Sequence, residues 1–341
     1  MTPKVKVLLI GSGGVGTMAA YNLETGGQAT VTTVLRSNYH FVKENGFTIT
    51  SIDHGDIKGW RPTHITNSIP NVSETGEKYD LLVVTTKNIP DIPPTIVDLI
   101  TPAVTPSHTT IMLLQNGLNI ERPLITAFPT NPILSGVSLI GATETSPGNI
   151  VHDDRDRVTV GPFLSPGIPG ERCVEAAREF VRLYGASGRV GVRYEEDVGG
   201  CRWGKLVYNA SYNGACAITG MDTSSMRMAG FPIEGVIRPL MEEVVRVARA
   251  AGHELPGGIV EDMIDCDPWD TFFKPSMQQD IEKGNFIEFE NTIGEPLREA
   301  ERLGVPAPGL KMLYELLKIK QFQLKLKKGV VVLSTRRGSR G

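Results

Sequence analysis

The chain has 341 residues, which is more than a typical single domain, so we expect two domains with room for two cores. With 40% hydrophobic residues and a net charge of −3, its composition suits a soluble protein and gives no reason to expect a nucleic-acid partner. No apolar run approaches the roughly 20 residues that span a bilayer, so no membrane partner is expected.

Cellular context can also be predicted from the sequence. The chain enters its first strand pattern within ten residues, which leaves no room for a leader peptide. The four cysteines, Cys173, Cys201, Cys216 and Cys266, lack C-x-x-C spacing and are interpreted as reduced thiols. We therefore expect a cytoplasmic enzyme without a metal, which acts on a small molecule and could form a homodimer.

A glycine-rich run follows the apolar residues 5–10 and precedes residues 17–23, which suit a helix. It fits G-x-G-x-x-G, in which glycines allow a tight turn and a close approach to pyrophosphate at the start of a helix. The strand before the run and the helix after it make the pattern specific. We predict a dinucleotide site at Gly11, Ser12, Gly13, Gly14, Val15 and Gly16.

The next strand pattern, residues 29–35, decides between the two nicotinamide cofactors. Enzymes that use NAD usually carry an acidic residue there, about 20 residues past the glycines, for the ribose 2′-hydroxyl. This chain has Arg36, whose guanidinium matches a 2′-phosphate, so we predict NADP (NADPH) as the cofactor. The alternative is a solvated arginine that closes the strand.

The remaining elements divide the chain into two parts. Apolar or alternating runs predict strands at residues 47–51, 56–60, 79–85, 110–114, 133–142 and 157–160, with a short helix at 95–100. After residue 193 only helices are predicted, at 198–219, 233–251, 257–265, 275–283, 288–303 and 310–328. We expect an α/β Rossmann-type domain (1–194) with a doubly wound parallel sheet, an all-helical domain (195–330) and a flexible tail (331–341). The substrate is expected between the two domains.

Three polar side chains interrupt the apolar helix predicted at residues 203–218. Lys205, Asn209 and Asn213 are four residues apart, which places them in one stripe along the helix. Buried polar groups need partners, and a polar ligand could supply them. The alternative is a structural lysine with asparagines that bond loop backbone. Glu288 presents a similar choice, because it could cap a helix or pair with Lys205 or a substrate hydroxyl.

These pieces resemble the ketopantoate reductase (2-dehydropantoate 2-reductase) family over residues 11–317. The resemblance rests on GSGGVG, Leu35-Arg36, Thr86-Lys87 and Gln115-Asn116-Gly117. It also includes Gly148-Asn149-Ile150 and Val160-Gly161-Pro162. The helical half contributes Trp203-x-Lys205-x-x-x-Asn209-x-x-x-Asn213 and Ser276-Met277-x-x-Asp280, with Glu288 twelve residues after the serine.

The resemblance implies a role for each matching residue. Arg36 would hold the 2′-phosphate, and Lys87 and Asn116 would lie at the cofactor and substrate end of the sheet. Lys205 would be the general acid that protonates the carbonyl oxygen during hydride addition. Asn209 and Asn213 would bind the substrate, Ser276 its carboxylate, and Glu288 its hydroxyl or the lysine. Lys87 could instead be a solvated residue at a strand end.

The chain departs from the family pattern at two positions. Thr223 stands where an asparagine helps to bind the substrate, and Phe273 replaces another asparagine three residues before Ser276. Thr223 is kept as a substrate-binding candidate. The departures leave three alternatives open: reduction of ketopantoate, reduction of another 2-keto acid in a specialised pathway, or a non-catalytic NADP-binding regulatory protein.

Overall fold

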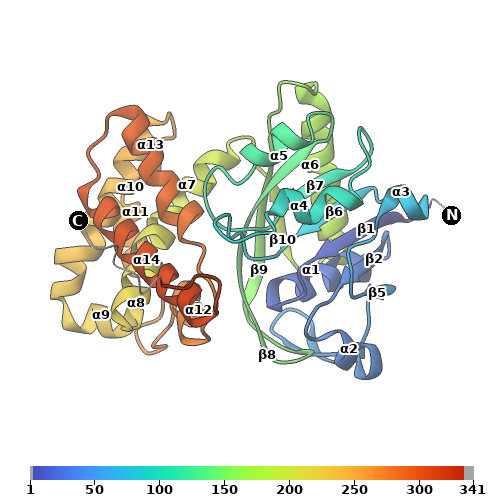
Figure 1. Cartoon of the computed structure of the whole chain (residues 1–341), viewed down its shortest axis with the longest axis horizontal. Helices are drawn as coiled ribbons and strands as arrows, with labels where there is room; N and C mark the ends of the chain where they lie inside the picture. Colours follow the sequence, from blue (N-terminus) through green and yellow to red (C-terminus); the bar gives the residue numbers. More distant parts are fainter. Residues whose placement is uncertain (1–2, 334–341) are drawn as a thin grey trace, which may run out of the picture. The chain divides into compact units, whose positions relative to one another are not determined.

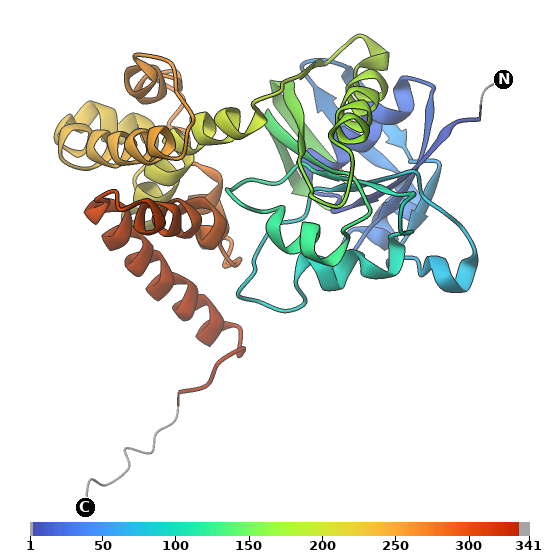
Figure 2. The same cartoon turned by 90° about the horizontal axis from the view of Figure 1, so that it is seen from above.

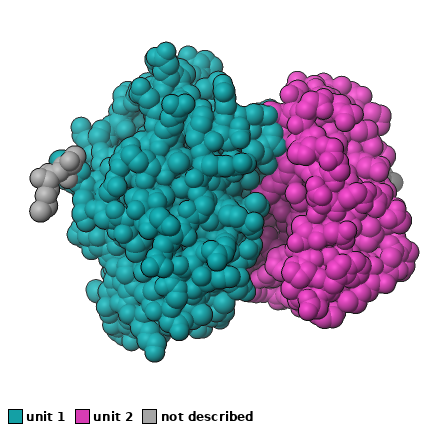
Figure 3. Space-filling model, turned by 180° about the vertical axis from the view of Figure 1, so that it is seen from behind, with its two compact units in different colours: residues 1–201 teal, residues 202–341 magenta. Residues whose placement is uncertain are grey.

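The computed structural model describes residues 3–333, and these form two compact units, residues 1–201 and 202–341 (Figure 3). The predicted tail at 331–341 therefore lies mostly outside the described residues. The predicted domain boundary follows residue 194, where the last strand ends, whereas the first unit extends to Cys201. The helix that begins at Val198 runs from one unit into the other.

The first unit is built on one mixed sheet, which has ten strands among the described residues (Figure 1). Its order is β4-β3-β9-β8-β7-β6-β1-β2-β5, with β10 paired to β9. From β5 to β8 every neighbouring pair is parallel, as predicted for the Rossmann-type sheet. The strands are β1 Val5–Ile10, β2 Ala29–Val34, β3 Phe47–Ser51, β4 Gly55–Trp60, β5 His64–Thr66, β6 Leu81–Val84, β7 Thr110–Leu113, β8 Ile133–Ser146, β9 Asn149–Phe163 and β10 Gly191–Tyr194.

The doubly wound parallel sheet that the sequence predicts is present, but the whole sheet is mixed because two pairs of its strands are antiparallel. β8 and β9 form a long antiparallel hairpin, and β3 pairs antiparallel with β4. The sequence predicted only residues 133–142 and 157–160 of the hairpin. Its tip, residues 143–156, is mostly polar. Ile150, His152 and Asp156 are buried there, but two of these three are polar, so the tip carries little hydrophobic alternation to detect.

Helices cover both faces of this sheet, so side chains that alternate along each strand enter two cores (Figure 2). Val7 and Leu9 of β1 pack with α1 (Gly14–Thr25) and α6 (Gly170–Tyr184). Leu8 and Ile10 pack with α4 (Ile96–Ile100) and α5 (Arg122–Ala127). This alternation is the arrangement expected for central parallel strands buried on both faces. Two further helices lie in the connections between strands: α2 (Tyr39–Asn45) between β2 and β3, and α3 (Val72–Thr75) between β5 and β6.

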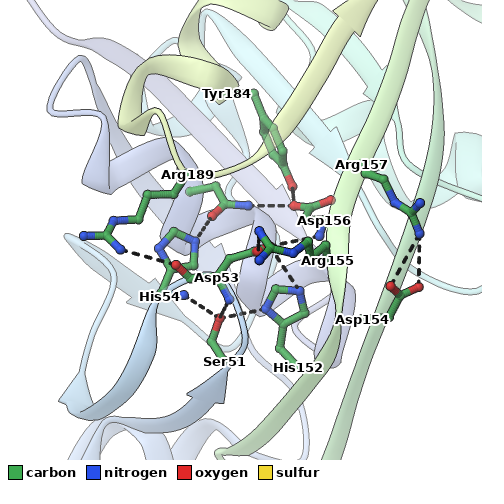
Figure 4. A network of polar contacts seen from close by, with 11 residues as sticks. Ser51, Asp53, His54, His152, Asp154, Arg155, Asp156, Arg157, Tyr184 and Arg189 are labelled. Carbon is green, nitrogen blue, oxygen red and sulfur yellow. Dashed lines mark hydrogen bonds and ion pairs between the residues drawn. The ribbon is translucent and has the colours of Figure 1, made fainter.

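A buried polar network joins α1, α6, β9 and the turn after β3 (Figure 4). The Asp156 carboxylate, only 1% exposed, accepts hydrogen bonds from Asn22 Nδ2 at 2.7 Å and Tyr184 Oη at 2.6 Å. Burial raises the pKa of Asp156 to about 6, although both hydrogen bonds favour its charged form. Ser51 Oγ and His152 Nδ1 lie 2.8 Å apart in the same network. Asn22, Ser51, His152, Asp156 and Tyr184 are all buried, and each is hydrogen-bonded to another of the five, so we assign this part of the network a structural role.

The second unit is helical, as predicted. No helix within residues 3–333 combines the length and the apolar character needed to cross a membrane. Three π-helical turns lie inside the longer helices, and α9 is a helix that the sequence did not predict. The elements are α7 Val198–Tyr208, η3 Asn209–Asn213, α8 Gly214–Thr219, α9 Thr223–Ala229, η4 Ile233–Ile237, α10 Arg238–Ala250, α11 Ile259–Ile264, α12 Ser276–Glu282, η5 Glu290–Gly294, α13 Glu295–Leu303 and α14 Pro308–Lys327.

Candidate functional site

The glycine run forms the turn between β1 and α1, as predicted. A Cβ atom on Gly16 would lie 1.7 Å from the carbonyl oxygen of Gly11, so only glycine fits there. A Cβ on Gly14 would lie 2.1 Å from the carbonyl oxygen of Ala142, which brings β8 against the start of the helix. Gly13, in contrast, has open space where its side chain would be.

The N-terminus of α1 is suited to an anionic group. The N-cap residue is Gly13, no side chain caps this end, and the first turn carries no acidic residue. The first backbone N–H groups of a helix have no partner within the helix and carry the positive end of its dipole. Together with the open space at Gly13, this arrangement fits the pyrophosphate of a dinucleotide.

Arg36 lies exposed two residues beyond β2. The neighbouring segment is fixed by Asn38, whose Nδ2 donates to the carbonyl oxygen of Ser12 at 3.1 Å and to Glu144 Oε1 at 2.8 Å. The hydroxyl of Ser12 donates in turn to the carbonyl oxygen of Val34 at 3.2 Å. The structure therefore connects the segment that carries Arg36 to the glycine run. Sequence analysis did not predict this connection.

Lys87 and Asn116 follow β6 and β7, and both strands end at the same edge of the sheet as β1. Lys87 is exposed and Asn116 is half-buried. The two connections are linked by Gln115, whose Nε2 donates to the carbonyl oxygen of Thr86 at 2.7 Å. Lys87 and Asn116 therefore lie at the same edge of the sheet as the glycine run. This carboxyl edge is where α/β proteins bind their ligands.

In the helical unit, Lys205 lies half-buried on α7. Burial lowers the pKa of the Lys205 ammonium to about 8, and the nearby charge of Arg202 acts in the same direction. The carboxylate of Glu288, itself 7% exposed, partly offsets this effect and raises the pKa. The structure thus places the Glu288 carboxylate where its charge acts on Lys205. Sequence analysis left open whether Glu288 would pair with Lys205 or with a substrate hydroxyl. The structure also adds Arg202, which sequence reasoning missed although it precedes Lys205 by three residues on the same helix.

The predicted substrate-binding residues of the catalytic helix are joined to Ser276. Asn213 Nδ2 donates to Asn209 Oδ1 at 3.0 Å, and these two residues are the ends of the π-helical turn η3. Asn213 Oδ1 accepts from the backbone N–H of Met277 at 3.1 Å and from Ser276 Oγ at 3.5 Å. Single π-helical turns within helices are frequent at functional sites. Asn209, Asn213 and Ser276 therefore form one polar cluster, although Asn213 and Ser276 are 63 positions apart in the sequence.

Thr223 is fully buried at the start of α9, after the N-cap residue Asp222. Its backbone N–H donates to the carbonyl oxygen of Phe273 at 3.0 Å. Its hydroxyl has no hydrogen-bond partner within the part of the chain that the structure describes. The two positions at which the sequence departs from the family pattern are thus in direct contact, which the sequence alone did not predict.

Comparisons with known proteins identify the family. The family model described as Ketopantoate reductase PanE/ApbA matches residues 7–165, and the model for its C-terminal part matches residues 197–321. The chain is 35% identical to an uncharacterized protein of Saccharomyces cerevisiae, with 96% of each chain covered. It is 25% identical to a 2-dehydropantoate 2-reductase of Nostoc, with 92% of this chain and 94% of the relative covered. The crystal structure of 2-dehydropantoate 2-reductase from Methylococcus capsulatus is 32% identical, with a TM-score of 0.79 and 94% and 98% of the two chains covered.

Proposed function

This chain belongs to the ketopantoate reductase family of oxidoreductases, and from that premise we propose that it reduces 2-dehydropantoate to pantoate with NADPH. The observation that carries the proposal is the line of polar side chains on a largely apolar helix. Lys205 is partly buried beside Glu288, and Asn209 and Asn213 continue the line to Ser276. A protein that only bound a dinucleotide would need none of these groups.

The residues of the first unit would hold the cofactor. Residues 11–16 would receive the pyrophosphate, Arg36 the 2′-phosphate, and Lys87 and Asn116 the end nearer the substrate. When bound, NADPH supplies the hydride that the 2-keto carbon accepts. Arg36 is exposed, and a guanidinium can bond two phosphate oxygens at once.

The residues of the second unit would bind the 2-keto acid and supply the proton. Lys205 donates a proton to the carbonyl oxygen as negative charge develops there. Glu288 keeps the ammonium charged at neutral pH by offsetting the effects of burial and Arg202. Asn209, Asn213 and Thr223 would bind the substrate, and the hydroxyl of Ser276 would bind its carboxylate. A homodimer, a cytoplasmic location and the domain boundary at residue 194 stay predictions.

The direct test is a steady-state assay of the purified protein with NADPH and 2-dehydropantoate, followed at 340 nm. We expect NADPH oxidation that depends on the keto acid and yields pantoate. Turnover of a different 2-keto acid, with none of 2-dehydropantoate, would support the second candidate, which the side chains of Thr223 and Phe273 favour because they depart from the family pattern. NADPH binding without reduction of any 2-keto acid would contradict the reductase proposal.

Cofactor choice depends on Arg36. We expect Arg36→Ala to weaken NADPH binding by about 10-fold to 100-fold, because hydrogen bonds to a charged group contribute roughly 1.5–3 kcal/mol. NADH, which has no 2′-phosphate, should bind the variant and the wild type equally. Isothermal titration with each cofactor measures both values, and Lys58→Ala, which removes another exposed charge from the same unit, serves as the control. An unchanged preference in Arg36→Ala would refute this role.

A further inference from the structure

Three aromatic side chains are exposed within five residues of the segment between α11 and α12. Trp269 and Phe272 are each 54% exposed, and Phe273 is 41% exposed. We call residues 269–273 the aromatic segment. Single exposed apolar side chains are ordinary, whereas three large ones within five consecutive residues are typical of a binding surface.

The aromatic segment is held in place by a buried arginine. Arg227 of α9 is 5% exposed, and its guanidinium donates to the carbonyl oxygens of Asp267 at 2.6 Å and Pro268 at 3.1 Å. The same guanidinium lies over the Trp269 ring, 4.8 Å from its centroid. A buried cation that bonds loop backbone fixes the loop in one conformation, and a preordered surface loses less entropy when it binds a ligand.

The helix that carries the polar cluster holds the near end of this loop. Tyr208 Oη donates to Asp267 Oδ2 at 2.6 Å, and Tyr212 Oη donates to the carbonyl oxygen of Ile264 at 3.3 Å. Tyr208 directly precedes Asn209 in the sequence, and Tyr212 directly precedes Asn213. The loop is therefore attached to the turn that bears the predicted substrate-binding amides.

The far end of the loop leads directly into Ser276. Phe273 accepts a hydrogen bond from the backbone N–H of Thr223, and the backbone N–H of Phe272 donates to Ser224 Oγ at 3.0 Å. Phe272 has a φ of +46°, a conformation that is strained for an aromatic residue. Three residues after Phe273, the Ser276 hydroxyl joins the Asn213 amide. The aromatic rings thus lie on a segment whose near end is bonded to the helix that bears Asn209 and Asn213 and whose far end leads into Ser276.

We propose that the aromatic segment contacts the substituent of the 2-keto acid, and that it extends the substrate range of the proposed reductase beyond 2-dehydropantoate to 2-keto acids with an aromatic or otherwise large and apolar substituent. This inference rests on the proposed reductase function and names the substrate class of the same site. The polar cluster suits the carboxylate and keto groups that all 2-keto acids share, whereas the rings of Phe272 and Phe273 offer no hydrogen bonds to a hydroxyl and Trp269 offers only its indole N–H. Arg227 acts as a positioning residue for the segment.

The experiment compares kcat/KM for phenylglyoxylate, an aryl 2-keto acid, with kcat/KM for 2-dehydropantoate, whose substituent carries a hydroxyl. We expect Phe273→Asn to lower the phenylglyoxylate to 2-dehydropantoate ratio of kcat/KM at least tenfold. Phe322→Asn is the matched control, because Phe322 is also a phenylalanine with 41% exposure but lies on α14. That control should leave the ratio at the wild-type value.

A second variant tests the positioning role separately. We expect Arg227→Met to raise KM for phenylglyoxylate at least fivefold more than KM for 2-dehydropantoate, with little change in kcat. A loss of folding would lower the thermal midpoint and the activity on both substrates together, whereas a positioning role changes the KM values selectively.

The outcomes separate the two proposals. An unchanged ratio in Phe273→Asn, with 2-dehydropantoate still reduced, would overturn the inference alone. A ratio that changes equally in Phe322→Asn would also overturn it. If Phe273→Asn instead lowers the association state in sedimentation velocity and leaves the ratio unchanged, the aromatic segment contacts a second copy of the chain and the inference is wrong. Absence of 2-keto acid reduction in the wild type would overturn the proposed function and this inference with it.

Discussion

Replacing Lys205 with alanine should lower kcat for 2-keto acid reduction by about 10²–10⁴, the usual range for removing a general acid. The alkoxide that forms on hydride addition would lose the proton that the ammonium supplies. The affinity for NADPH should stay within about threefold of wild type, because the groups proposed for the cofactor lie in the first unit. Stopped-flow single-turnover measurement of NADPH oxidation, with titration of NADPH fluorescence, provides both numbers.

The control for this change is Lys320→Ala. Lys320 is also a half-buried lysine in the helical unit, but it lies on α14. Its replacement should leave kcat unchanged, and both variants should melt as cooperatively as wild type in circular dichroism. A kcat for Lys205→Ala within threefold of wild type would show that another group supplies the proton.

The elements with a strong local signal were predictable from sequence. β1 was predicted with its observed bounds and the glycine run in its observed place, because apolar runs and glycine spacing are local features. The helix after the run was predicted too short, at 17–23 instead of Gly14–Thr25. The family, the fold class and the oxidoreductase class are confirmed by the two family models and by the solved structures. In contrast, α6 was missed although Cys173, Ala177 and Phe180 are spaced for one helix face. Its exposed charged residues lower its average hydrophobicity, and only a search for periodicity would have found it.

The sequence predicted only part of the candidate site. The prediction that Asn209 and Asn213 share one helix face rests on their four-residue spacing. The hydrogen bond between the two side chains confirms that they do. The link from Asn213 to Ser276 depends on how distant helices pack, which no local pattern determines. The same is true of Arg227, because a buried arginine that bonds the backbone of a loop forty residues away is visible only in the folded chain.

Reduction of the 2-keto acid should also fall steeply at alkaline pH. Lys205 must be protonated to act as an acid, and burial lowers its pKa to about 8. The protonated fraction is therefore nearly complete at pH 7, about half at pH 8 and about a tenth at pH 9. An ordinary lysine, with a pKa of roughly 10.4, would stay charged over this whole range. A kcat/KM profile from pH 6 to 10 should thus decrease about tenfold for each pH unit above 8.

Glu288→Gln should move the midpoint of that profile. The carboxylate of Glu288 raises the pKa of Lys205, so its neutralisation leaves burial and Arg202 to lower the pKa further. The midpoint should then lie below pH 8, and the loss of activity relative to wild type should grow from pH 6 to pH 9. Glu290→Gln is the matched control, because the carboxylate of Glu290 is paired with Arg298 and bonded by Tyr314 instead. Its profile should superimpose on that of wild type. A wild-type profile that stays level to pH 10, or a midpoint that moves to higher pH in Glu288→Gln, would contradict the assignment of Lys205 as the acid held charged by Glu288.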